Sequence, residues 1–213
     1  MLRLNDTLIA ESNPASYISE SFRSLRTYIH QQVLRHTDRG TVLMFASPDK
    51  GEGKTTLLAN LGVSFAQEGR KVVLIDCDLR QSSLHEAFGM ENTNGLSAYL
   101  RGGASSKEIL RKGGQELYVV PGGENLYNAP DLFGGERMTA LLDELKNEYD
   151  LILLDSPSAL DYTDARLLAS LTDGVILVAK HASTKRESLR KTKQLMDQAG
   201  ATLLGIVMNQ VKM

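Results

Sequence analysis

Residues 41–56 read Thr41-Val42-Leu43-Met44-Phe45-Ala46-Ser47-Pro48-Asp49-Lys50-Gly51-Glu52-Gly53-Lys54-Thr55-Thr56, an apolar run followed by a glycine-rich turn and the start of a helical pattern. A Gly-Lys-Thr core between a strand and a helix is the context that a P-loop requires. Backbone N–H groups of such a loop bind phosphate oxygens, Lys54 neutralises phosphate charge, and Thr55 offers its hydroxyl to Mg²⁺. Pro48 replaces the first glycine of the usual GxxxxGK[ST] pattern, so an ordinary glycine-rich turn remains the alternative.

Beyond this stretch, short apolar runs alternate with amphipathic segments. The predicted strands are residues 41–46, 72–75, 117–120, 151–154, 175–178 and 203–208, and the predicted helices are residues 15–34, 53–68, 136–149, 163–171 and 185–199. Because these strands are apolar throughout, we expect helices to cover both faces of the sheet. The pattern predicts a three-layer α/β/α fold with a doubly wound, mostly parallel sheet. Residues 89–114 are predicted to be an irregular or short-helix insertion.

Carboxylates follow two of the predicted strands. Asp76 and Asp78 come after residues 72–75, and Asp155 comes after residues 151–154. The carboxyl ends of parallel strands line the crevice where α/β proteins bind ligands. Asp155 is placed to hold Mg²⁺, and of the other two, one is placed to support the metal's water shell while the other accepts a proton from a hydroxyl nucleophile. The alternative is that these carboxylates only cap the turns after the strands.

The length and composition limit the function classes. A chain of 213 residues predicts one domain, 1–213, with an amino-terminal arm, 1–39, and a nucleotide-binding core, 40–213. The net charge of −2 gives no bulk basicity for nucleic acid, so no nucleic-acid partner is expected. A single cysteine, Cys77, excludes a disulfide framework, and we interpret it as a small packing residue. Without a signal peptide or a long apolar run, the chain is expected to be cytoplasmic.

Asp76-Cys77-Asp78-Leu79-Arg80 after an apolar run resembles the Walker-A′ motif of bacterial tyrosine kinases, the BY-kinases of capsule and exopolysaccharide synthesis. Glu20, Arg23 and Arg26 match the ExxRxxR motif of that family. The resemblance covers nearly the whole chain, through Leu84–Gly89, Gly95–Leu100, Pro121–Gly123, Asn128–Leu132, Tyr149–Ser156, Asp161–Ala165 and Gly205–Asn209. It implies a P-loop NTPase related to MinD and ParA, with protein-tyrosine kinase and ATPase activity.

The resemblance also implies roles for residues. ATP and Mg²⁺ are the implied cofactors, with Lys54, Asp76 and Asp78 in catalysis and Asp76 preferred as the base that activates a tyrosine hydroxyl. The residues implied to bind the nucleotide are Asp49, Lys50, Gly51, Glu52, Gly53, Lys54, Thr55, Thr56 and Arg80, although Arg80 fits a subunit interface equally well. The implied metal ligands are Thr55, Asp78 and Asp155.

Partners follow from the same resemblance. Glu20, Arg23 and Arg26 are implied in ring-like self-assembly, whereas the residues alone favour a solvated helix face with a Glu–Arg pair. A membrane adaptor, or polysaccharide co-polymerase, is implied to recruit the chain to the inner face of the cell membrane. The implied substrates are tyrosines of proteins.

The sequence departs from the family in three places. The last tyrosine is Tyr162, so the tyrosine cluster that ends many members is missing from this sequence, and Ser82 and Ser158 stand where prolines are frequent. The tyrosines from Tyr99 onward are interpreted as packing or surface residues rather than phosphorylation sites.

Two alternatives to a kinase remain. One is a MinD- or ParA-like ATPase switch, and the other is a nucleotide-binding scaffold. MinD and ParA proteins carry a signature lysine five positions before the P-loop lysine, and this chain has Asp49 there, with Lys50 one place off. This difference favours the kinase.

Overall fold

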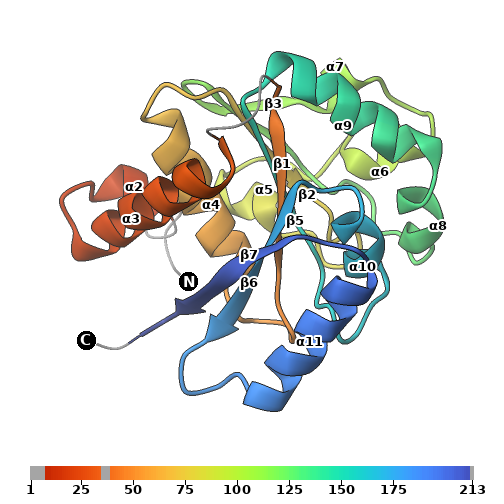
Figure 1. The fold of residues 1–213 in the computed structure, drawn as a ribbon. Coiled ribbons are helices and arrows are strands. Elements are labelled where there is room, and N and C mark those ends of the chain that lie inside the picture. The colour runs from red at the N-terminus through yellow and green to blue at the C-terminus, as the bar shows by residue number, and fades with distance from the viewer. Residues whose placement is uncertain (1–7, 35–38, 212–213) are drawn as a thin grey trace.

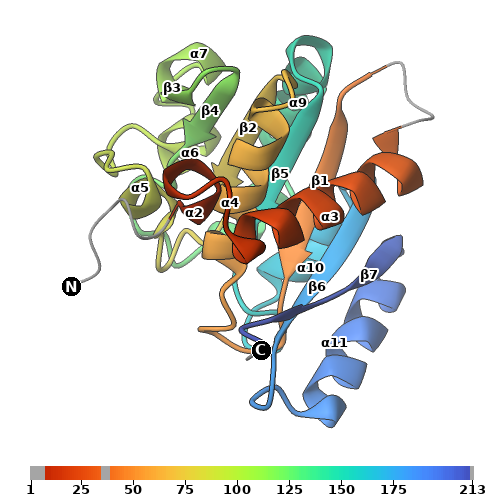
Figure 2. The same ribbon diagram turned by 90° about the vertical axis from the view of Figure 1, so that its left-hand side faces the viewer.

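The computed structural model describes residues 8–34 and 39–211 (Figures 1 and 2). Its centre is a sheet of seven strands in the order β3-β4-β2-β5-β1-β6-β7. All neighbouring strands run parallel except β3, which pairs with β4 in the antiparallel sense. The strand bounds are β1 Thr41–Ala46, β2 Val72–Asp76, β3 Arg111–Gly114, β4 Leu117–Val120, β5 Leu151–Asp155, β6 Gly174–Lys180 and β7 Leu203–Asn209.

Helices cover both faces of the sheet, which is seen nearly edge-on in Figure 1. On one face lie α2 Ile9–Ser12, α3 Tyr17–Gln32, α4 Lys54–Ala66 and α5 Leu84–Ala87. On the other lie α6 Leu96–Leu100, α7 Ser106–Ile109, α8 Ala129–Phe133, α9 Glu136–Glu148, α10 Asp164–Ala169 and α11 Arg186–Gln198. The central strands β1, β2 and β5 are buried along their whole length, as expected for strands covered on both faces.

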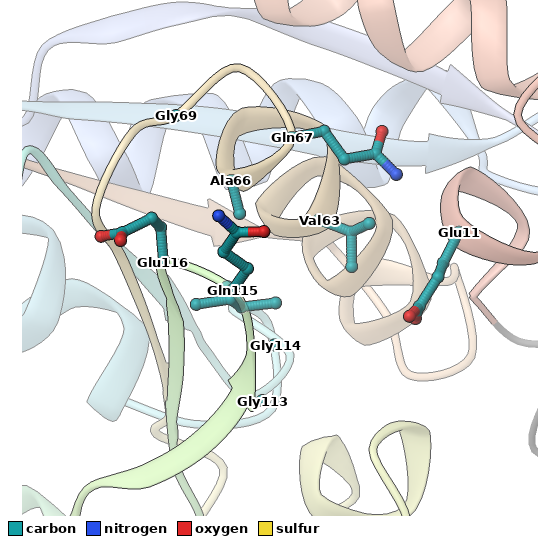
Figure 3. A pocket seen from close by; sticks show the side chains of 10 residues that line it. Glu11, Val63, Ala66, Gln67, Gly69, Gly113, Gly114, Gln115 and Glu116 are labelled. Carbon is teal, nitrogen blue, oxygen red and sulfur yellow. The ribbon is translucent and has the colours of Figure 1, made fainter.

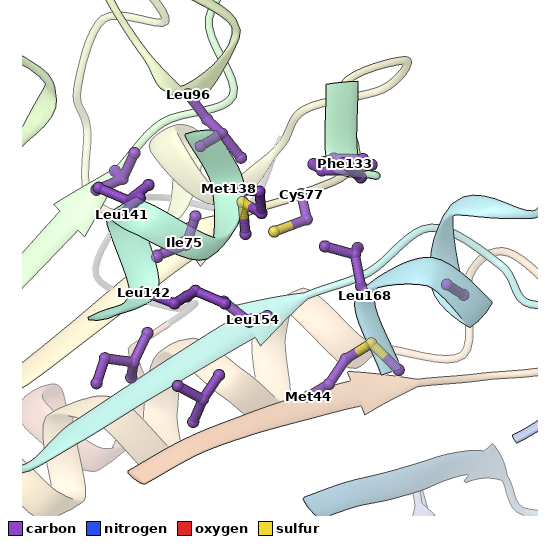
Figure 4. Packing of buried hydrophobic residues seen from close by; sticks show 14 of the residues in the cluster. Met44, Ile75, Cys77, Leu96, Phe133, Met138, Leu141, Leu142, Leu154 and Leu168 are labelled. Atoms are coloured by element: carbon purple, nitrogen blue, oxygen red, sulfur yellow. The ribbon is translucent and has the colours of Figure 1, made fainter. Parts of the chain in front are cut away.

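Two apolar layers hold this arrangement together. In the layer shown in Figure 4, Met44 of β1 and Leu154 of β5 pack under Met138 of α9 and Leu168 of α10. Cys77 is fully buried in this layer, which confirms its predicted packing role. Burial first, and then the neighbouring carboxylates, raise the pKa of the Cys77 thiol well above its usual range, so it stays protonated.

The predicted α/β fold is confirmed. Each strand and helix that the sequence predicted is present, with ends displaced by at most two residues. Residues 89–114 contain the short helices α6 and α7 and also β3, a strand that the sequence did not predict. Its residues Arg-Lys-Gly-Gly have no apolar alternation, and pairing with β4 rather than intrinsic preference makes them a strand. The predicted arm, 1–39, includes residues 1–7 and 35–38, which lie outside the described residues.

Over residues 8–34 and 39–211, each helix is too short or too polar to cross a lipid bilayer.

Candidate nucleotide site

The P-loop connects the end of β1 to the start of α4. Gly51 and Gly53 have positive φ angles of +80° and +89°, a conformation that glycine adopts without steric cost. The Lys54 side chain folds back and its Nζ donates to Ser47 Oγ at 2.8 Å. Ser47 Oγ in turn donates to the carbonyl of Asp49 at 2.7 Å. The loop and its lysine are therefore preorganised around the N-terminus of α4, which is the end of a helix that binds anions.

Glu52 connects the P-loop to β7 and to the turn that follows β6. Its backbone carbonyl accepts a hydrogen bond from Asn209 Nδ2 at 2.9 Å, and its Oε1 accepts one from Thr184 Oγ1 at 2.6 Å. Its Oε2 is buried with no hydrogen-bond partner among the described residues. Burial is the main cause that raises the pKa of Glu52. The Glu52 side chain is thus directed to Thr184, and its predicted contact with the nucleotide remains a prediction.

Asp155 and Thr55 form the closest pair of predicted metal ligands. Thr55 Oγ1 donates to Asp155 Oδ2 at 2.5 Å, while Asp155 Oδ1 is buried without a hydrogen-bond partner in the part of the chain that the structure describes. Asp155 lies beside Asp76 in the register of β5 and β2. Burial first, and then the charge of Asp76, raise the pKa of Asp155 from 3.8 to about 7.

This arrangement fits a bound Mg²⁺. An uncompensated buried carboxylate oxygen is costly, and a cation or its water would satisfy it. Within the described residues, no three His, Cys, Asp or Glu side chains are placed to hold a metal ion together. Mg²⁺ keeps several waters and takes one or two carboxylates plus phosphate oxygens, so Thr55, Asp78 and Asp155 would suffice as its protein ligands.

The two Walker-A′ aspartates have different surroundings. Asp76 is fully buried, and its Oδ2 accepts hydrogen bonds from Ser82 Oγ at 2.7 Å, from the Ser83 N–H at 2.9 Å and from the Leu84 N–H at 3.0 Å. Burial raises the pKa of Asp76, and these hydrogen bonds, with Ser82 the largest contributor, oppose that rise. Asp78 is only half-buried. The assignment of Asp76 as the base therefore stays a prediction.

Asp78 and Lys50 connect the Walker-A′ turn to itself and to the P-loop. Asp78 Oδ1 accepts hydrogen bonds from the backbone N–H groups of Gln81 at 3.0 Å and Arg80 at 3.3 Å. The Lys50 Nζ contacts the Gln81 side chain. Asp49 and Thr56 are exposed at the rim of the loop. These contacts bring the first two predicted motifs together across the ends of β1 and β2.

The Arg80 side chain contacts the segment that follows β5. Its Nη1 forms an ion pair with Asp164 Oδ1 at 2.7 Å, and its guanidinium lies 4.4 Å from the centre of the Tyr162 ring. Its Nη2 donates to the carbonyl of Tyr127 at 3.4 Å. Asp164 is fully buried. Arg80 thus joins the Walker-A′ turn to the segment after β5, and its contact with the nucleotide remains a prediction.

Several residues that shape the site were not predicted. Ser47, Gln81, Asn209 and Thr184 contact the P-loop through side chains, and Ser82 contacts Asp76. In the sequence, Ser82 stands out only as a departure from a frequent proline. Its hydroxyl is a further signal, since a hydroxyl that follows a strand-end carboxylate can donate a hydrogen bond to it.

The ExxRxxR residues lie on α3, which packs on α4. Glu20 and Arg23 form an exposed ion pair at 2.6 Å. Arg26 is instead directed into the chain, where its Nη1 donates to the carbonyl of Ser64 at 2.5 Å and to Ser64 Oγ at 3.2 Å. Its Nε lies 3.6 Å from Glu68. Arg23 Nη2 also contacts the carbonyl of Pro14 at the surface. Of the three, Glu20 and Arg23 are the more exposed and can still be reached by another subunit.

A hollow of about 270 Å³ lies apart from these motifs, between α2, the end of α4 and the turn that joins β3 to β4 (Figure 3). Glu11 lines it from α2, Gln67 lines it from the end of α4, and Gln115 and Glu116 line it from the turn between β3 and β4. Gln67 Nε2 donates to the carbonyl of Ala10 and so fastens α2 to α4. None of the predicted site residues lines this hollow.

The comparisons with known proteins agree with this geometry. A family model described as an AAA domain matches residues 40–201. Over 212 residues the chain is 35% identical to the tyrosine-protein kinase YwqD of Bacillus subtilis, a match that covers 99% of this chain and 89% of YwqD. The chain belongs to the family of bacterial tyrosine-protein kinases. It spans only 28% of a Klebsiella pneumoniae relative, the putative tyrosine-protein kinase in the cps region, and so corresponds to one part of that longer protein.

Solved structures of this family have the same fold. The kinase domain of the Escherichia coli tyrosine kinase ETK is similar with a TM-score of 0.91 and 29% identity over 97% of this chain and 80% of that one. The chimerical protein CapA2B2 has the same TM-score and 30% identity over 98% and 91%. The MinD protein of Pyrococcus horikoshii, in complex with Mg-ADP, is more distant, with a TM-score of 0.68 and 26% identity over 79% and 70%. The chain therefore has the nucleotide-binding fold that it shares with both groups.

Proposed function

We propose that this chain transfers the γ-phosphate of ATP to tyrosine hydroxyls of proteins that belong to a capsule or exopolysaccharide system. The observation that carries the proposal is the Thr55–Asp155 pair, whose free carboxylate oxygen lies buried at the ends of the strands beside Asp76. Such an oxygen is explained by a cation that accompanies a nucleotide. Because the chain belongs to the tyrosine-kinase family, we infer that the phosphate acceptor is a tyrosine hydroxyl.

Each part of the site would have a defined task. The N–H groups of the P-loop and Lys54 would bind the β- and γ-phosphates of ATP. Thr55, Asp78 and Asp155 would hold Mg²⁺, which neutralises the charge that develops on the phosphates. Asp76 would accept the phenolic proton late in the transfer, since a phenol with a pKa near 10 is not ionised beforehand. Phosphoryl transfer depends mainly on this alignment and charge neutralisation.

Assembly and location complete the proposal. We infer that the chain acts as one nucleotide-binding unit that forms a ring-like homo-oligomer through the face that carries Glu20 and Arg23, with Arg26 supporting that face from within. The exposure of Glu20 and Arg23 supports this inference. A membrane adaptor of the polysaccharide co-polymerase type would recruit it to the inner face of the cell membrane from the cytoplasm.

The test is an incubation of the purified protein with Mg-ATP, with and without the cytoplasmic segment of a candidate adaptor. Phosphotyrosine on the chain, the adaptor and a generic tyrosine peptide is mapped by mass spectrometry, and Lys54→Met serves as the inactive control. Tyrosine modification that is absent in Lys54→Met is the expected result. Release of ADP without any modified tyrosine would refute the kinase and favour an ATPase switch of the MinD type.

The residues just before the P-loop lysine argue against a switch of the MinD type. The residue five positions before Lys54 is Asp49, and the neighbouring Lys50 contacts Gln81 of its own chain. A switch of the MinD type would need a lysine at the position of Asp49.

A further inference from the structure

Most tyrosines of this chain have partners that occupy the ring or the hydroxyl. All seven tyrosines lie within the described residues. Tyr28 donates its hydroxyl to the carbonyl of Leu204. Rings or guanidinium groups contact Tyr99, Tyr118, Tyr149 and Tyr162. The two that remain are Tyr17, which is 67% exposed, and Tyr127, which is 93% exposed.

Tyr127 lies on the loop between β4 and α8. This loop follows the carboxyl end of β4, which runs parallel to β2 and β5, so it lies at the end of the sheet where those strands carry the predicted nucleotide site. The Leu126 N–H donates to the carbonyl of Leu79 at 2.8 Å, and Arg80 Nη2 donates to the carbonyl of Tyr127 at 3.4 Å. Both partners belong to the Walker-A′ turn. The loop therefore presents Tyr127 from the rim of the site, although its ring is directed into solvent.

Buried residues on both sides fix the loop. Leu126 is 4% exposed and Ala129 is fully buried, whereas Glu124, Asn125 and Asn128 are exposed together with Tyr127. An exposed tip between two buried anchors is accessible to another molecule but cannot move far without breaking those contacts. Tyr127 is thus accessible to a second copy of the chain, while the anchors on both sides of it limit how far the loop can turn toward its own site.

Tyr17 has a different setting, because it is the first residue of the helix α3. Its carbonyl accepts a hydrogen bond from Ser21 Oγ at 3.1 Å, and Ser16 caps the same turn through the Ser19 N–H. Tyr17 is therefore part of a regular helical turn, whereas Tyr127 lies on a loop, where residues that contact other molecules are found more often.

The sequence alone predicts Tyr127 to be a packing or surface residue, and its 93% exposure changes that interpretation. We propose that Tyr127 is a phosphate acceptor of this kinase and is modified by a second copy of the chain. This inference rests on the proposed function and names one of its substrates. The phenolic oxygen forms a new bond to the γ-phosphorus, the bond between that phosphorus and the β–γ bridging oxygen breaks, and ADP leaves with the bonding electrons. The phenolic proton passes to a carboxylate of the second copy.

The test uses two variants of the chain, one that donates phosphate and one that only receives it. The donor is the full chain with Tyr127→Phe, which keeps the backbone contact to Arg80 and all predicted catalytic groups. The receiver is a size-tagged full chain with Lys54→Met, which accepts phosphate but does not transfer it. After incubation with Mg-ATP, and with the adaptor segment if the donor needs it, phosphotyrosine on the receiver is quantified and mapped. We expect phosphate at Tyr127, with loss of most of the label from a Lys54→Met, Tyr127→Phe receiver.

Matched controls decide the other outcomes. A Lys54→Met, Tyr17→Phe receiver should keep the label. If the Tyr127→Phe receiver keeps it as well, or if the donor modifies a generic tyrosine peptide but no receiver, the inference is wrong while the proposed function stands. If the wild-type chain modifies neither peptide nor receiver, the proposed function itself fails. Thermal unfolding of each receiver verifies that a lost label does not reflect a lost fold.

Discussion

Charged motifs lie in two regions of the molecule, at the ends of β1, β2 and β5 and on the outer face of α3. Two carboxylates are buried in the first region, whereas the charged pair in the second is exposed. At the strand ends, Asp76 and Asp155 are buried side by side, and one oxygen of Asp155 has no partner among the described residues. On α3, Glu20 and Arg23 pair in solvent. Burying an unpaired polar atom costs free energy, so it persists where a ligand can satisfy it. An exposed pair costs nothing and indicates little by itself.

The largest effect should come from Asp155→Asn. The amide keeps the shape and can still accept from Thr55, but it removes the negative charge at the predicted metal position. We expect phosphotransfer to fall by about 100-fold or more, the size of losses seen when one group that stabilises transition-state charge is removed. Asp143→Asn, an exposed change on α9, serves as the control. Equal phosphotransfer rates for the two variants would show that the unpaired oxygen of Asp155 has no role in the reaction.

The same pair of variants tests the pH dependence of stability. The pKa of folded Asp155, about 7, lies above its ordinary value of 3.8. The folded state therefore retains a proton that the unfolded state has lost, and the stabilisation from this proton is full below pH 3.8 and is lost as pH rises through 7. Without nucleotide, Asp155→Asn should raise the melting temperature over the wild type more at pH 8 than at pH 5.

The expected difference is several degrees, since about 1 kcal/mol corresponds to about 2–4 °C in a domain of this size. Thermal unfolding at both pH values measures it, with the exposed Asp143→Asn as the control. A constant difference between wild type and Asp155→Asn at the two pH values would mean that Asp155 is not held in a protonated state by its surroundings.

The P-loop offers a comparison within the site itself. Gly51 and Gly53 both have positive φ, but a Cβ on Gly51 meets open space, whereas one on Gly53 lies 2.1 Å from Asn209 Nδ2. Gly51→Ala should cost about 1–2 kcal/mol of folding free energy from backbone strain alone. Gly53→Ala should cost about 1 kcal/mol more, because the hydrogen bond from Asn209 to the Glu52 carbonyl is displaced. Denaturant unfolding measures both, and equal losses would show that Asn209 does not brace the loop.

The sequence predicted the fold well because its signals are local. Apolar runs, the glycines of the P-loop and the carboxylates after β2 and β5 each follow from residues next to one another. It failed at β3, where Arg111–Gly114 become a strand only because β4 offers an open edge. The same reason explains the unpredicted contacts of the site, since Thr184 and Asn209 reach Glu52 from more than 130 residues away.

The roles of charged residues were harder to predict than their places. Arg80 and Arg26 were predicted to contact a nucleotide or another subunit, and in the structure both have partners within the chain, Asp164 and Ser64. Neither partner has a spacing pattern that identifies it in the sequence. A long side chain can reach over an area that sequence spacing does not define.

Arg26→Ala should therefore act on the fold. Its guanidinium joins α3 to α4 through the carbonyl and hydroxyl of Ser64, and its side chain is only 18% exposed. We expect a loss of about 1–2 kcal/mol in the free energy of unfolding, as for other hydrogen bonds of a charged, partly buried donor. Arg26→Lys should restore part of it. Unchanged unfolding in urea for Arg26→Ala would place Arg26 with the assembly residues instead.

The smallest effect on folding is expected for Arg23→Ala. This variant tests directly whether the exposed face of α3 has a function that its contacts within the chain do not show. The Arg23 guanidinium pairs with Glu20 and also contacts the carbonyl of Pro14, and both contacts are exposed, so Arg23→Ala should change the free energy of unfolding by less than about 1 kcal/mol. If the α3 face nevertheless joins subunits, the same variant should reduce the oligomer seen by analytical ultracentrifugation in the presence of Mg-ATP. Reversing the pair, with Glu20→Arg and Arg23→Glu together, should keep the monomer intact and tests whether the sign of each charge matters to the neighbour. If the oligomer is unchanged in both variants, Glu20 and Arg23 make no contact between subunits, and this face of α3 is solvated surface.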